Sequence, residues 1–207
     1  MTSVITSPEN IINLALVRVG REPYVQSIYE GSLAAKAALA IYGQTRDDLL
    51  RTQDWPFARR DVGLTLLKAA PPGGYVPPTV WDATTNPPLP YSYEYAYPAD
   101  ALRIRSVRNA DTFLVNYDPR DNLFTVSNDN NYSPAQKVIL CDVGPTAVAS
   151  YTGQILDPST MDADFIEVLV AALATPLAIS FEKFEAARIA GQNELREEAE
   201  AENVQGG

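Results

Sequence analysis

Residues 91–107 read YSYEYAYPADALRIRSV and predict two β-strands joined by a turn. In the first half every second residue is a tyrosine, so an extended strand would carry all four rings on one face. The four rings belong to Tyr91, Tyr93, Tyr95 and Tyr97. Pro98 has no backbone N–H to donate and closes this strand. Alternation resumes at 102–107, where we expect the second strand.

The sequence around this stretch, from residue 58 to 156, is also strand-like. Short alternating segments separated by turn residues predict a small antiparallel sheet or sandwich. The expected strands are 64–66, 91–97, 102–107, 113–117, 123–126, 138–143 and 147–151. We expect the last two to form a hairpin around Gly144-Pro145. Residues 71–90 hold most of the prolines and predict a long extended loop.

Helical periodicity replaces the alternation on the N-terminal side of this region. Ser7 is suited to cap a helix whose first residue is Pro8, and Gly20 is suited to end it. A second helix is expected from about residue 32 to Trp55, where Pro56 ends it. Its expected apolar stripe consists of Ala35, Leu39, Tyr42 and Leu49.

A third helical region follows the strands. Asp157 begins it, and apolar residues then recur at helical spacing from Phe165 to Pro176. Pro176 is expected to kink the helix or to end its first half. Beyond residue 194 the sequence is a charged tail.

Together these patterns predict an α+β fold, because none of the helices can hide its apolar face alone. We expect the N- and C-terminal helices to form a helical bundle with an inserted antiparallel β domain. The helical domain would comprise residues 1–57 and 157–207, and the β domain residues 58–156 with the Pro-rich loop 71–90.

The composition argues against an enzyme. The chain has no histidine, which excludes a Ser-His-Asp triad and every zinc site that contains histidine. Its single cysteine, Cys141, excludes an internal disulfide and a cysteine-rich metal site. No calcium loop or Gly-rich phosphate loop is present either. We therefore expect no catalytic, cofactor or metal residues, and no cofactor.

Charge and hydropathy bear on the partners. A formal net charge of −10 argues against a protein whose main task is to hold nucleic acid, although it suits a surface that DNA passes without sticking. Simple solubility explains the charge equally well. No run of about eighteen unbroken apolar residues predicts a membrane span.

Two sets of residues have a functional and a structural interpretation. One interpretation of the tyrosine row is a platform on which carbohydrates or nucleic-acid bases stack. We favour the other interpretation, in which the row is the packed face of a sheet or part of a subunit contact. Arg103, Arg105 and Arg108 are candidates to face DNA, and the alternative is a solvated strand face paired to acidic residues.

Four stretches in this order resemble the tail tubular protein A family of short-tailed phages, the head-to-tail adaptor or gatekeeper ring. They are INLALVRVGREPY (12–24), YGQTRDDLLRTQDWPFARR (42–60), YEYAYPADALRIRSV (93–107) and DADFIEVLVAALATPLAISF (162–181). The Trp-Pro-Phe-Ala exit of the second stretch followed by the Tyr-Pro-Ala-Asp turn of the third is the most specific combination. The chain lacks one residue that family members commonly carry before the proline of that turn.

The resemblance implies a structural protein of the virion, made in the host cytoplasm. Its copies would form a dodecameric ring that joins the portal protein to the tail nozzle and lines part of the channel for double-stranded DNA. The expected portal interface comprises Glu182, Phe184, Arg188, Ile189, Leu195, Arg196 and Val204. Tyr91, Tyr93, Tyr95 and Tyr97 would contact neighbouring subunits or the nozzle. The alternative function is a carbohydrate-binding or adhesion module that uses the tyrosine-rich strand.

Overall fold

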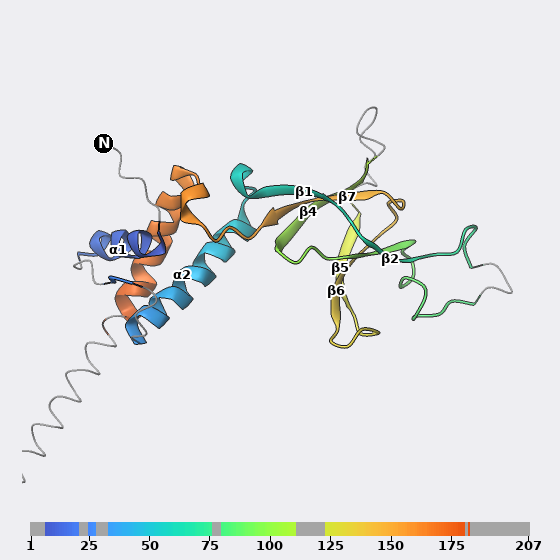
Figure 1. Ribbon diagram of the computed structural model, residues 1–207, viewed down its shortest axis with the longest axis horizontal. Coiled ribbons are helices and arrows are strands. Elements are labelled where there is room, and N and C mark those ends of the chain that lie inside the picture. The colour runs from blue at the N-terminus through green and yellow to red at the C-terminus, as the bar shows by residue number, and fades with distance from the viewer. Residues whose placement is uncertain are drawn as a thin grey trace, which may run out of the picture. The chain divides into compact units, whose positions relative to one another are not determined.

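The computed structural model describes residues 7–20, 25–27, 33–75, 80–110, 123–180 and 182 (Figure 1). The chain divides into two compact units. The helical unit comprises residues 1–49 and 155–207, and the β unit comprises residues 50–154. The helices and the antiparallel sheets confirm the predicted α+β class.

Helix α1 spans Pro8–Arg18 and begins and ends as the sequence predicts. The Ser7 side chain accepts a hydrogen bond from the Asn10 amide at 3.3 Å and so satisfies one of the free N–H groups of the first turn. Gly20 has a φ of 75°, a left-handed conformation that glycine adopts without strain. The buried face of the helix consists of Ile11, Ile12, Ala15 and Leu16.

Helix α2 spans Leu33–Thr52, and its buried face differs from the predicted stripe. Ala38, Tyr42 and Arg46, one turn apart, are buried, whereas Leu39 is 38% exposed. The Arg46 guanidinium lies 5.6 Å from the centre of the Tyr42 ring. Its Nε also donates to the Asp47 carboxylate at 2.8 Å. An arginine can occupy a buried position when its charge is paired and its stem is packed in this way.

The third helix covers Ala163–Ser180 and follows the 3-10 helix η4, Pro158–Thr160. Its buried side chains include Phe165, Leu169, Leu173 and Leu177 at helical spacing. An end of the helix at Pro176 was one of the two expectations, and the helix instead continues through this residue to Ser180. Burial of apolar side chains in the turns on both sides stabilises the helix by more than the hydrogen bond that proline removes. Among the described residues this is the one helix long and apolar enough to cross a membrane by length and composition. Its buried stripe is what the core helix of a globular unit shows, so those two properties alone do not make it a membrane span.

The β unit contains two antiparallel sheets. Strands β1 (Arg59–Gly63), β7 (Ala147–Gly153) and β4 (Ala101–Asn109) form one sheet in the order β1-β7-β4. Strands β2 (Leu66–Ala69), β3 (Tyr93–Ala96), β6 (Gln136–Cys141) and β5 (Phe124–Asp129) form the other in the order β2-β3-β6-β5. The short 3-10 helix η1, Pro56–Ala58, leads from α2 into β1.

Both sheets contribute to a single hydrophobic core. It contains Tyr95, Ile104, Val107, Ile139, Cys141, Val143, Ala147, Ala149 and Tyr151. Cys141 is a buried free cysteine in this core, and burial raises the pKa of its thiol to about 11, so the residue acts as a small apolar side chain.

The predicted hairpin around Gly144-Pro145 is wrong. Strand β6 pairs with β3 and β5, whereas β7 pairs with β1 and β4. The turn therefore carries the chain from one sheet to the other, and the hairpin of this region is instead β5 with β6. The expected strand at 113–117 lies outside the described residues.

Candidate functional site

One buried cation and two buried carboxyl groups lie together on the sheet β2-β3-β6-β5, on the face turned away from the core. Tyr93 and Tyr95 of β3 face the core, so Glu94 between them points to the opposite face. Lys68 of β2 is the register partner of Glu94. Asp129, at the end of β5, completes the group that we call the Lys68 cluster. The exposed fractions of the three side chains are 6% for Lys68, 0% for Glu94 and 7% for Asp129.

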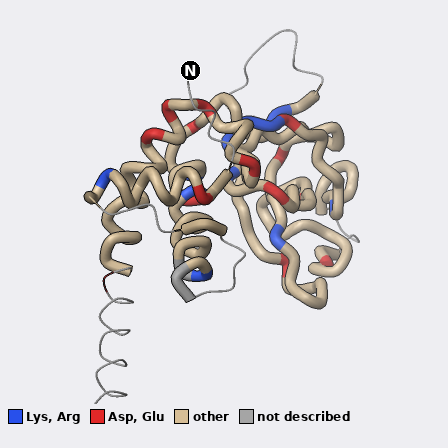
Figure 2. The backbone as a smooth tube through the Cα atoms, turned by 60° about the vertical axis from the view of Figure 1, so that its left-hand side comes forward, with Lys and Arg blue, Asp and Glu red and all other residues tan. Residues whose placement is uncertain are grey.

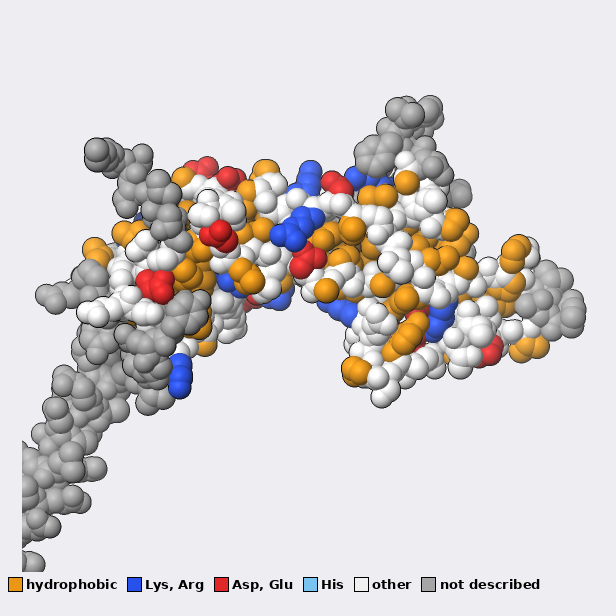
Figure 3. Space-filling view, in the orientation of Figure 1, with side chains coloured by type: hydrophobic (Ala, Val, Ile, Leu, Met, Phe, Trp, Pro, Cys, Tyr) orange, Lys and Arg blue, Asp and Glu red, His pale blue; other side chains and the backbone are white. Residues whose placement is uncertain are grey.

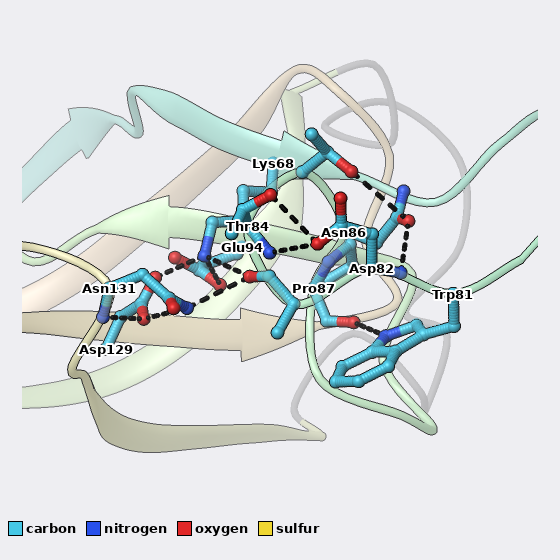
Figure 4. A network of polar contacts seen from close by, with 11 residues as sticks. Lys68, Trp81, Asp82, Thr84, Asn86, Pro87, Glu94, Asp129 and Asn131 are labelled. Carbon is cyan, nitrogen blue, oxygen red and sulfur yellow. Dashed lines mark hydrogen bonds and ion pairs between the residues drawn. The ribbon is translucent and has the colours of Figure 1, made fainter.

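The ammonium group of Lys68 is shared unequally by the two carboxyls (Figure 4). Its Nζ donates to Oδ2 of Asp129 in a close ion pair, whereas it lies 3.5 Å from Oε2 of Glu94. Neither carboxyl oxygen of Glu94 has a hydrogen-bond partner among the described residues. The Lys68 Nζ also lies 5.6 Å from the centre of the Tyr132 ring. Glu94 is thus the member of the cluster that is buried without full compensation.

The electrostatics of the cluster follow from this inequality. Burial raises the pKa of Glu94 to about 7, the charge of Lys68 partly opposes the rise, and the neighbouring carboxyl of Asp129 adds to it. Burial acts in the same direction on Asp129, but the hydrogen bonds from Lys68 and from the Asn131 backbone outweigh it and lower the pKa of Asp129. Burial opposes the charge of Lys68, yet the two carboxyls raise its pKa. At neutral pH Asp129 and Lys68 are therefore charged, and Glu94 is close to its titration midpoint.

The predicted Pro-rich loop is hydrogen-bonded to this cluster through Ala83. The carbonyl oxygen of Ala83 accepts hydrogen bonds from Lys68 Nζ at 3.2 Å and from Asn131 Nδ2 at 3.0 Å. Asn131 is held in turn by Asp129, whose Oδ1 accepts from the Asn131 amide at 2.9 Å and from its Nδ2 at 2.8 Å. A single backbone carbonyl of the loop is thus bound by Lys68 of the cluster and by Asn131, which Asp129 orients.

The segment around Ala83 has its own internal structure. Asp82 Oδ1 accepts from the backbone amide of Thr84 at 2.9 Å and from its hydroxyl at 2.8 Å. Trp81 closes the segment because its ring N–H donates to the Pro87 carbonyl at 2.9 Å (Figure 4). We call residues 80–90 the covering loop. Val80 and Leu89 of this loop are 81% and 61% exposed, and hydrophobic side chains are visible over the β unit in Figure 3.

The chemistry open to the Lys68 cluster is limited. Its side chains are covered, so they can bind or release a proton but offer no accessible nucleophile. Within the part of the chain that the structure describes, no group of three or more His, Cys, Asp and Glu residues is placed to hold a metal ion. The arrangement is a buried ion-pair cluster in which burial raises the pKa of one carboxyl group, Glu94.

Three of the four tyrosines of the row, Tyr93, Tyr95 and Tyr97, lie in or against the core of the β unit. Tyr95 is fully buried, and its hydroxyl donates to the Val143 carbonyl at 3.0 Å. Tyr93 stacks on Tyr95 with 6.2 Å between ring centres, and both Tyr93 and Tyr97 pack against the core. Tyr95 therefore offers no surface to a partner. A subunit or nozzle contact stays a prediction for Tyr91, Tyr93 and Tyr97, which are half-buried.

Arg103 and Arg105 bind backbone carbonyls at the end of α2. Arg105 donates through Nη2 to the carbonyls of Leu50 at 3.1 Å and Arg51 at 3.2 Å, and through Nε to Thr152 Oγ1 at 2.8 Å. Arg103 donates to the Arg51 carbonyl at 3.0 Å. The last carbonyls of a helix have no donors within the helix, and a cation there also complements its dipole. Both arginines thus have a structural task within the β unit.

Arg108 is paired with an acidic residue. Its guanidinium donates to Asp61 at 2.8 Å and to the Ser150 hydroxyl at 2.9 Å. Figure 2 shows that basic and acidic positions are interspersed along the described backbone. The DNA-channel role of Arg103, Arg105 and Arg108 stays a prediction, and the structure provides an internal partner for each.

The helical unit carries an apolar groove between α1 and the third helix. The groove has a volume of about 390 Å³. It is lined by Leu14, Val17, Arg18, Ala163, Ile166, Glu167 and Val170. Segments from both ends of the chain therefore share one surface.

The expected portal interface falls almost entirely outside the described residues. Glu182 is described and exposed. Phe184, Arg188, Ile189, Leu195, Arg196 and Val204 lie beyond the described range.

The Lys68 cluster was not predicted from the sequence. One signal was available, since Glu94 interrupts the tyrosine row on the face that a buried strand turns away from the core. Nothing in the sequence indicated that Lys68 and Asp129 would lie beside it, because they are 61 residues apart in the chain.

No protein-family model matches the chain, and no match is found among curated proteins.

Proposed function

We propose that the chain is a subunit of a phage head-to-tail adaptor ring, which joins the portal to the tail nozzle and forms part of the DNA channel. The proposal rests on the resemblance of the four stretches at 12–24, 42–60, 93–107 and 162–181. Its mechanism is mechanical: the ring bridges two assemblies and lets the genome pass.

The observation that best supports the proposal is the division of the chain. The expected adaptor architecture needs both chain ends in one helical body and the intervening residues in a separate β body. The compact unit of residues 1–49 and 155–207 and the unit of residues 50–154 fit this requirement. The groove shared by α1 and the third helix agrees with a helical bundle built from both ends, which is part of the proposal. Had the first and last fifty residues shared no contacts, the proposal would have lost its basis.

A ring requires each copy to present two different surfaces to its neighbours. We assign the half-buried Tyr91, Tyr93 and Tyr97 to contacts with neighbours or nozzle, and the segment from Glu182 to Val204 to the portal. Rings of this kind can assemble only on their partner, so the partner belongs in the test.

Native mass measurement of the chain, alone and mixed with the portal protein of the same phage, tests the proposal. A complex with twelve copies per portal ring supports it, and cryo-electron microscopy of that complex shows whether the β unit faces the tail. A chain that stays monomeric and unbound in the presence of the portal contradicts it. A variant that lacks residues 194–207 tests the portal assignment separately, because unchanged portal binding removes that segment from the interface.

A further inference from the structure

The Lys68 cluster contains one more carboxyl group than its cation can balance. Lys68 carries one positive charge, and Asp129 takes it through a close ion pair. If Glu94 also ionises, the cluster holds a net negative charge at a position where all three side chains are less than a tenth exposed. Such a charge is strongly disfavoured unless water or another group reaches it.

The groups that face Glu94 come from every element packed around it. Lys68 lies on β2, Asp129 on β5, and Tyr132 follows β5. Asp82 of the covering loop is near enough to interact with Lys68 electrostatically. On β6 the register partner of Glu94 is Leu140, which is apolar. Lys68 is therefore the cation for which an ionised Glu94 would compete.

Competition for Lys68 bears directly on the covering loop. The Ala83 carbonyl is bound by Lys68 and by Asn131, and Asn131 is oriented by Asp129. Lys68 Nζ lies 3.2 Å from the Ala83 carbonyl oxygen and 3.5 Å from Oε2 of Glu94, so an ionised Glu94 would attract the same ammonium group that binds Ala83. The strands around the cluster are held by the backbone hydrogen bonds of the sheet. The covering loop, as the structure describes it, has no such ladder, so we expect it to move before the strands do.

We propose that Glu94 operates a proton-dependent latch on the covering loop. With Glu94 neutral, Lys68 serves Asp129 and the Ala83 carbonyl, and the loop is fastened to the sheet. When the Glu94 carboxyl releases its proton to water, the carboxylate draws Lys68 away from Ala83, and the loop loosens. The latch thereby controls how Val80, Trp81 and Leu89, all exposed apolar side chains, are presented to solvent.

The geometry is reinforced by the acid-base properties of the cluster. Burial raises the pKa of Glu94 to about 7, so the latch changes state near neutral pH. The chain has no histidine, so no imidazole titrates in the same range. This inference does not depend on the proposed adaptor function.

Two nuclear magnetic resonance signals of the full-length chain test the latch. The ¹³C shift of the Glu94 carboxyl reports its protonation, and the ¹³C shift of the Ala83 carbonyl reports the hydrogen bonds that this oxygen accepts. We expect both signals to titrate together with a midpoint of about pH 7. If Glu94 titrates near its ordinary value of 4.5, or if it titrates near 7 while Ala83 does not respond, the latch is ruled out.

A second readout uses fluorescence and a matched pair of variants. In a Trp55→Phe background, Trp81 of the covering loop is the remaining tryptophan. Its emission should change across the same pH range, and Glu94→Gln should abolish the change because the amide stays neutral. Glu167→Gln, the same substitution at an exposed helical position, should leave the change intact. A pH response that survives Glu94→Gln overturns the proposal, and the wild-type titration decides the matter should that variant fold poorly.

Discussion

Replacing Glu94 by glutamine should stabilise the β unit at neutral and alkaline pH. Removal of a buried carboxylate that faces a lysine would ordinarily be expected to weaken a fold. Here the opposite sign follows, because burial and the neighbouring carboxyl of Asp129 together disfavour an ionised Glu94 more than the charge of Lys68 favours it. Glutamine has the size of the neutral glutamic acid and cannot ionise.

The magnitude follows from the pKa of Glu94, which rises from 4.5 to about 7 on folding. An acid whose pKa is raised by folding contributes stability that is complete below its unfolded pKa and is lost as the pH rises to its folded pKa. A shift of one unit corresponds to about 1.4 kcal/mol, so the full loss is roughly 3 kcal/mol. Between about pH 5.5 and about pH 8 the wild-type free energy of unfolding should fall by about 2 kcal/mol from this group alone. At about pH 8 the variant should therefore be more stable than the wild type by roughly 3 kcal/mol.

Urea unfolding, monitored by tryptophan fluorescence, measures the difference in stability between the wild type and Glu94→Gln in the β unit. Both tryptophans, Trp55 and Trp81, lie within residues 50–154, so the signal reports the β unit. The other two members of the cluster do not interfere. The lowered pKa of Asp129 affects stability only at acidic pH, and the raised pKa of Lys68 affects it only at strongly alkaline pH.

The reasoning is refuted if the wild type and Glu94→Gln show the same dependence on pH, or if the variant is the less stable of the two at about pH 8. Glu167→Gln supplies the control, because an exposed carboxylate should leave the wild-type slope unchanged. If the free energy of unfolding of the wild type falls with pH and neither substitution changes this dependence, a group other than Glu94 causes it.

Three further substitutions test other parts of the structure. Lys68→Met should destabilise the β unit by about 3–5 kcal/mol in urea unfolding, because Asp129 would stay buried without its cation. A loss of stability below about 1 kcal/mol would contradict the burial of this ion pair. Tyr95→Phe should cost about 1–2 kcal/mol in the same assay, since the Val143 carbonyl loses its hydroxyl donor, and no loss would mean that water replaces the hydroxyl. Ser7→Ala should lower the thermal stability of the helical unit by about 1 kcal/mol through loss of the α1 cap, measured by circular dichroism, with Ser7→Asn as the variant expected to retain it.

Local sequence signals predicted the beginnings and ends of elements better than their partners. Ser7, Pro8 and Gly20 specify α1 through chemistry that acts within a few residues, and the structure confirms them. The pairing of β6 and β7 depends instead on which sheet each strand joins, and a Gly-Pro turn fits a sheet-to-sheet crossing as well as a hairpin. Short-range patterns therefore could not distinguish the two arrangements.

The face of α2 shows a different limit. Leu39 was assigned to the stripe because it is apolar, and Arg46 to the polar flank because it is charged. The structure reverses both assignments, since Arg46 continues the row of Ala38 and Tyr42 at a spacing of four residues. A periodicity argument that counts only apolar residues misses an arginine whose charge is neutralised by the next residue, Asp47. The Lys68 cluster was missed for a related reason, because its charged side chains come together from strands that are far apart in the sequence.

The pairing of the arginines also bears on how a ring of this chain would treat DNA. Arg60 and Arg108 are paired with Asp100 and Asp61, and Arg105 is bound to carbonyls at the end of α2, so these three arginines of the described β unit are already engaged. A duplex that recruited them would have to break these contacts and leave acidic groups facing its phosphates. With a net charge of −10 the chain has little cationic surface to offer in exchange. Under the proposed adaptor function, we therefore predict that the channel lets DNA slide and does not hold it by electrostatic attraction.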